Sequence, residues 1–233
     1  RAVVPETLYA IASHPEISLW DTKVTIACEN PTAVSGSENV VGLVYNLLRA
    51  TGQIEKNEKG EIVRGFDYIL CDLSPAANTL NKLFVMSSHF VVIPTSPDYF
   101  SMIAINLLQR LLPEWDDWMQ ERCAMARAMR STLVPPTHKP IVLGYTVQVF
   151  TLTNDGSGDP AAGFLRWMER IHVQFMGGLL PVLQMRGMAL PNTNPVFHEL
   201  ARIRNYQSAG TAATMAHIPV FALSNAILFS LSF

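Results

Sequence analysis

Residues 66–78 read FDYILCDLSPAAN, an apolar run that ends at Asp72 and is followed at once by turn-forming residues. The run predicts a buried strand that ends at Asp72. Ser74 fits the N-cap, and Pro75 the first position, of a helix predicted over 74–88. In an open parallel sheet, ligands gather outside the carboxyl ends of the strands. A carboxylate at such an end has two ordinary roles: it binds Mg²⁺, directly or through water, or it caps the following helix.

The rest of the chain alternates short apolar runs with segments of helical periodicity. Further strands are predicted over 23–28, 89–94 and 140–150. Helices are predicted over 6–13, 38–50, 101–112 with a continuation through 113–131, 161–185 and 196–216. Short, continuously apolar strands separated by amphipathic helices are what a parallel sheet covered on both faces requires. The chain is therefore predicted to be an α/β protein, a mostly parallel sheet with helices on both faces, forming a single domain over 1–233.

Composition limits the functions that the chain can have. Its 233 residues are 49% hydrophobic and 15% charged, with a formal net charge of -2, so no global basic field attracts nucleic acid or anionic lipid. The three cysteines are far apart and not in metal-ligand spacing, which predicts a reducing, cytoplasmic setting. The six histidines contain no i, i+4 pair, so a metal site built on histidine is not expected.

The order of features over 66–108 resembles the central segment of ParA/MinD-type ATPases, which are P-loop proteins with a deviant phosphate-binding loop. In that family a strand ends on an aspartate, a turn ending in proline follows, and a later strand ending in V(I/L)IP precedes a helix that begins near a serine. The matching positions here are Asp72, Pro75, the run 91–94 and Ser101. A weaker similarity continues at 140–150, where Gln148 stands at the place of a common asparagine, and at 199–223.

The resemblance implies a doubly wound P-loop NTPase-like fold that binds ATP and Mg²⁺. It implies that Asp72 holds Mg²⁺ through water, that Pro75 belongs to the second switch region, and that Pro94 and Gln148 lie at the nucleotide, Gln148 near the adenine. It also implies a homodimer formed through ATP, an activating ParB-like partner, nonspecific DNA binding, and a role in positioning a plasmid, a chromosome or another cargo.

One large departure from the family concerns the phosphate-binding motif KGGxxGK(S/T), which should precede this segment. The chain has five lysines, and none stands in a G-x-x-x-x-G-K frame. The domain is therefore expected to be incomplete at its N-terminus, without the first strand and the P-loop. Three alternatives remain open: a piece of a complete ATPase, a non-catalytic scaffold or interaction module on the same fold, and an unrelated α/β enzyme.

Candidate partner surfaces are few. Arg166 and Arg170 lie one turn apart on a predicted helix, where they form either a DNA-binding stripe or an ordinary solvated face. The stretch 109–131 is a candidate partner-binding insertion, although its tryptophans equally fit one buried helix face. Residues 220–233 contain no lysine or arginine, so no amphipathic membrane anchor is evident.

Overall fold

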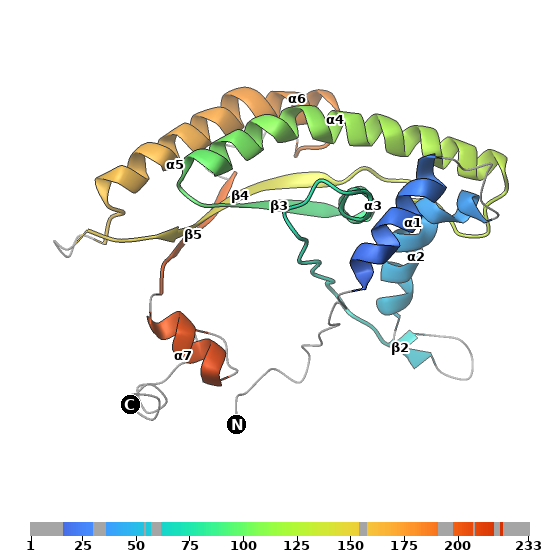
Figure 1. Ribbon diagram of the computed structural model, residues 1–233, viewed down its shortest axis with the longest axis horizontal. Coiled ribbons are helices and arrows are strands. Elements are labelled where there is room, and N and C mark those ends of the chain that lie inside the picture. Colours follow the sequence, from blue (N-terminus) through green and yellow to red (C-terminus); the bar gives the residue numbers. More distant parts are fainter. Residues whose placement is uncertain are drawn as a thin grey trace.

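A computed structural model describes residues 16–29, 36–53, 55–56, 62–153, 158–190, 198–206, 208–216 and 220 (Figure 1). The predicted helix over 6–13 and nearly all of 220–233 lie outside these residues. The elements are α1 (Ile17–Glu29), η1 (Ser37–Asn39), α2 (Val40–Thr51), β1 (Glu55–Lys56), β2 (Ile62–Arg64), α3 (Thr79–Ser87), β3 (Phe90–Thr95), α4 (Tyr99–Ala128), β4 (Ile141–Phe150), α5 (Ala162–Gln174), η2 (Phe175–Leu179), α6 (Leu180–Met185), β5 (Glu199–Arg204) and α7 (Ser208–Ala216). The protein is thus α/β, as predicted.

The centre of the fold is a parallel sheet in the order β3-β4-β5, while β1 and β2 form a small antiparallel hairpin. Strands β3 and β4 confirm the predictions over 89–94 and 140–150. Their register sets Pro94 opposite Thr146 and Thr95 opposite Val147. Both strands are mainly apolar, and their buried side chains lie on the face that packs against the core.

Helices α4, α5 and α6 lie over one face of this sheet (Figure 1). Between the two layers is the core, in which Tyr145 of β4 packs against Phe175 of η2 with ring centroids 5.0 Å apart. Ile105 of α4 and Ile171 of α5 are fully buried in the same cluster. The predicted helices over 101–131 and 161–185 are confirmed, and α4 continues through Pro113 as one helix of 30 residues.

The predicted strand over 23–28 is wrong, because these residues belong to α1. Val24, Ala27 and Cys28 are buried and stand at i, i+3 and i+4, so they form one face of a helix. That face packs among α2 and α3 at the end of α4. The β-branched residues favour a strand only weakly, and packing of this face outweighs the preference.

The prediction of mainly helical structure over 196–216 is half wrong. Residues 199–204 form β5, which pairs in parallel with β4 from Tyr145 onward, and only α7 is helical. The segment ELARIR is composed largely of good helix formers. Its position beside the open edge of β4 decides its structure, because pairing there satisfies the backbone groups of both strands.

Two histidine rings stack on each other near the start of the sheet. The rings of His89 and His138 lie 4.3 Å apart at an interplanar angle of 10°, and Nε2 of His138 lies 3.2 Å from the Ser88 carbonyl oxygen. Burial lowers the pKa of His138, and the neighbouring His89 lowers that pKa further.

Acidification is therefore expected to destabilise the fold through His138. Between the lowered pKa of the folded state and the ordinary value of about 6.5, the unfolded chain binds more protons, so the free energy of unfolding rises with pH. It should fall as the pH is lowered from about 7.5 to about 5.5. Urea unfolding at each pH measures this, and His138→Gln should weaken the dependence. An equal pH dependence in the variant and the unchanged protein would contradict the assignment.

Candidate functional site

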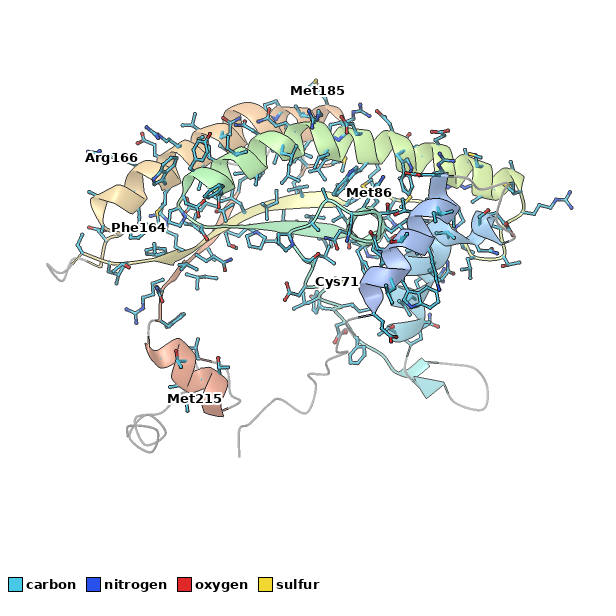
Figure 2. All side chains as sticks on the ribbon, viewed as in Figure 1. Cys71, Met86, Phe164, Arg166, Met185 and Met215 are labelled. Carbon is cyan, nitrogen blue, oxygen red and sulfur yellow. The ribbon has the colours of Figure 1, made fainter. Side chains whose placement is uncertain are left out.

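The segment that carries Asp72 is extended but is not a strand, so the prediction of a buried strand there is wrong. Tyr68 is 86% exposed and Leu70 is 92% exposed, and Asp72 is exposed as well. Figure 2 shows Cys71, the residue before Asp72, on the side of the sheet opposite α4. A strand needs a hydrogen-bonded neighbour, and no described strand pairs with this segment.

The helix after this segment begins later than predicted. Its N-cap is Asn78, whose Oδ1 accepts a hydrogen bond of 2.8 Å from the backbone N–H of Asn81. Ser74 and Pro75 therefore lie in the preceding loop and are exposed. The side chain of Asn81 donates to the carbonyl oxygens of Ser74, at 2.7 Å, and Ala76, at 2.6 Å. The loop around Pro75 is thus attached to α3 although it forms no part of the helix.

Pro94 and Gln148 lie at the carboxyl ends of neighbouring strands. Because Pro94 pairs with Thr146, and Gln148 follows Thr146 by two positions, both side chains share one face of the sheet. This is the face opposite to that of Val91 and Ile93, which pack on the core. Pro94 is exposed and Gln148 is half-buried, so a ligand at this end of the sheet could contact both.

The loop from β3 to α4 is held at both ends by side-chain hydrogen bonds. Asp98 is the N-cap of α4, and its Oδ1 accepts from the backbone N–H of Ser101 at 2.8 Å. The Oγ of Ser101 in turn accepts from the backbone N–H of Ser96 at 2.9 Å. Ser101 therefore lies in the first turn of α4, where it orders the loop that follows Pro94.

The structure brings together only part of the predicted site. Pro94, Gln148 and the loop ordered by Ser101 meet at the carboxyl end of the sheet. Asp72 and Pro75 lie on the segment before α3, and no hydrogen bond or ion pair among the described residues joins Asp72 to Pro94 or Gln148. The carboxylate of Asp72 is exposed to solvent.

A second concave site lies between α5 and β5. It is a groove of about 420 Å³, lined by Leu165, Met168, Glu169, His172, Glu199 and Arg202. The first four of these residues are spaced along one face of α5. Behind this lining, Nδ1 of His172 lies 2.9 Å from the hydroxyl of Tyr145, which is fully buried. Burial raises the pKa of Tyr145, and the nearby Glu199 raises it further, so this phenol stays neutral.

The charges of this groove are partly paired. Arg202 binds both carboxylate oxygens of Glu199, through Nε and through a terminal nitrogen. Glu169 is exposed, and within the described ranges it has no ion-pair partner. The groove is not predicted from the sequence, because the pattern over 199–204 predicts a helix. A correct strand assignment would have been the only available signal.

The predicted basic stripe on α5 is exposed. Figure 2 shows Arg166 near the N-terminal end of this helix. Arg170 lies over the ring of Trp167, with its guanidinium carbon 4.9 Å from the ring centroid. A cation–π contact of this kind anchors the side chain at the surface and leaves its charge accessible.

Three further findings concern metal binding, membrane spans and similarity to known proteins in the part of the chain that the structure describes and in its sequence. The described part contains no group of three or more His, Cys, Asp or Glu side chains placed to hold a metal ion. None of its helices has the length and apolar character needed to cross a membrane. Comparison with protein-family models, with curated proteins and with solved structures found no match to this chain.

Proposed function

We propose that this chain is the larger part of a ParA/MinD-type ATPase domain, with a doubly wound P-loop NTPase-like sheet. The observation that carries the proposal is the order of residues along the chain and sheet. Asp72 and Pro75 come first, then a parallel strand ending at Pro94, then a helix with Ser101 in its first turn, and then a parallel strand carrying Gln148.

The free edge of β3 supports a sheet with a further strand. β3 pairs only with β4 among the described strands. Phe90 and Val92 of β3 are 61% and 43% exposed, and the apolar segment before Asp72 is exposed too. One added parallel strand between β3 and that segment would pair with the free edge of β3 and give the segment before Asp72 a strand neighbour. In the proposed domain this strand leads into the phosphate-binding loop, and it comes from outside this sequence.

The residues present fit the magnesium and adenine ends of an ATP site but not its centre. Asp72 offers a carboxylate to hydrated Mg²⁺, a hard cation that prefers oxygen ligands and retains its waters. Gln148 offers an amide for hydrogen bonding near the base. The backbone cradle and the lysine that bind the phosphates are missing from the sequence, so they have to be supplied by another segment.

In the proposed cycle, ATP bridges two copies, and hydrolysis separates them and times the positioning of a plasmid, a chromosome or another cargo. A ParB-like partner would stimulate hydrolysis, and nonspecific DNA would bind to exposed arginines such as Arg166 and Arg170. The proposed setting is the cytoplasm, which the free thiols of Cys28, Cys71 and Cys123 fit.

The alternative is a non-catalytic scaffold or interaction module on the same fold, and the missing lysine motif favours it. ATP binding separates the two proposals. It should be measured with and without Mg²⁺ on this chain and on the full product of its gene, including any residues before Arg1. Binding by the full product alone supports a divided ATPase domain. Binding by neither protein would support the scaffold.

Asp72→Ala tests the role of the carboxylate in the full product. If Asp72 holds Mg²⁺ through water, Mg²⁺-dependent ATP hydrolysis should fall by about 10–100-fold, the usual cost of losing an outer-sphere metal partner. The fold should be unaffected because the side chain is exposed. Asp67→Ala is the matched control, since Asp67 is an exposed carboxylate on the same segment. Equal hydrolysis by both variants would remove Asp72 from the mechanism.

A further inference from the structure

The groove between α5 and β5 adjoins the outer edge of the sheet, so it combines side-chain and backbone binding groups. β5 pairs only with β4 among the described strands. Residues 200–204 are all exposed. The outward-facing N–H and C=O groups of such an edge are a template for an added strand.

Two polar groups in the groove remain available to a ligand. Glu199 and Arg202 neutralise each other, and Nδ1 of His172 lies within hydrogen-bonding distance of Tyr145. This leaves the carboxylate of Glu169 and Nε2 of His172 without a partner among the described residues. An accessible carboxylate beside an imidazole favours a cation. Leu165 lies one turn before Glu169 and is 41% exposed. It therefore favours a ligand that carries an apolar group beside its cation.

The spacing of these two groups suits an extended peptide. Leu165 and Glu169 are four residues apart on α5, which places them about 6 Å apart along the helix axis. Residues i and i+2 of a strand lie on the same face, about 6.7 Å apart. A strand that runs along the groove can therefore set an apolar residue on Leu165 and a basic residue on Glu169, two positions apart.

We propose that the groove between α5 and β5 binds an extended segment of a partner protein, which pairs with the outer edge of β5 and places a lysine or arginine side chain against Glu169. Main-chain hydrogen bonds supply affinity in this mode, and the pockets for alternate side chains supply specificity. A second copy of this chain is a poorer occupant. Its β5 would bring two arginines and one glutamate against the same charges.

The test uses the full chain and a fluorescein-labelled nine-residue peptide. The peptide contains one leucine and one lysine two positions apart, and all its other residues are threonines. Fluorescence anisotropy gives its Kd. A peptide with glutamate in place of lysine should bind about 5–10-fold more weakly. The attraction between the lysine and the exposed Glu169 is replaced by a repulsion of similar size between two carboxylates. Glu169→Lys should invert this preference. Glu121→Lys, at an exposed position of α4, should leave it unchanged. N-methylation at alternate peptide residues should remove binding.

Hydrogen exchange identifies the strand that the peptide covers. Exchange of the amides at 200–204 should slow when the lysine peptide is added. Failure of every peptide to bind would overturn the proposal, as would binding that ignores N-methylation or Glu169→Lys. Slow exchange of these amides without any peptide would also overturn the proposal. If the exchange rate then depended on protein concentration, a second copy of the chain would be covering the edge of β5. If it did not, the chain's own residues would be covering that edge.

Discussion

Replacing Gly144 by alanine is expected to lower the free energy of unfolding by about 3–5 kcal/mol, which sums a backbone strain and an overpacking cost of similar size. Gly144 has φ +153°, and a Cβ built there would lie 2.1 Å from the carbonyl oxygen of His198. That oxygen cannot move away freely, because it accepts the backbone hydrogen bond of Tyr145 at 2.8 Å. The substitution therefore separates the start of β5 from β4.

Urea unfolding followed by circular dichroism measures this loss. The matched control is Gly163→Ala in the first turn of α5, where nothing lies within 4 Å of the added methyl group. Its effect should be under about 1 kcal/mol and is expected to be stabilising, since alanine favours a helix over glycine. Equal midpoints for Gly144→Ala and the unchanged protein would show that His198 does not approach β4 in this way.

Replacing Asp116 by alanine is expected to cost about 2–4 kcal/mol, somewhat less than the range of about 3–5 kcal/mol for breaking a buried ion pair. The Asp116 side chain is 1% exposed, and its Oδ2 lies 2.8 Å from Nζ of Lys139 and 3.6 Å from a guanidinium nitrogen of Arg186. These contacts join α4 to the segments that flank the sheet. Both cations are about one-third exposed. They can therefore regain water after the change, which limits the loss.

The adjacent carboxylate provides the control. Asp117 also binds Arg186, but its side chain is 61% exposed. Its hydrogen bond with Arg186 lowers the pKa of Asp117, yet solvent screens an ion pair at this position. Asp117→Ala should therefore change the unfolding midpoint much less than Asp116→Ala. If the two variants lost equal stability, burial of Asp116 would not be the cause of its effect.

Several elements follow from local sequence. The two apolar runs that became β3 and β4 were predicted correctly, because each is continuous and bounded by polar or turn-forming residues. The long helix α4 was also predicted, since its apolar residues recur with helical spacing. Gln148 and Pro94 therefore stood at the ends of correctly assigned strands. Their common face could be stated only once the register of the two strands was known.

The errors share one physical origin. The segment before Asp72 has the composition of a buried strand, yet no described strand lies beside it, and its side chains are exposed. The segment 199–204 has helical composition, yet it pairs with β4. The segment 23–28 is rich in β-branched residues, yet it belongs to helix α1, and one face of that helix packs against other helices. In each case the structure depends on whether residues distant in the sequence pack or pair with the segment.

Local sequence patterns are enough to predict the α/β class and the positions of β3, β4 and α4, and they show that this sequence contains no lysine in a G-x-x-x-x-G-K frame. A helix forms its backbone hydrogen bonds within its own residues, so the spacing of its apolar residues is enough to predict it. Only tertiary packing places 199–204 at the edge of the described sheet, leaves the segment before Asp72 outside the described sheets, and opens a groove between α5 and β5. A strand is completed only by hydrogen bonds from a neighbour, and the strand's own residues do not specify whether that neighbour is present.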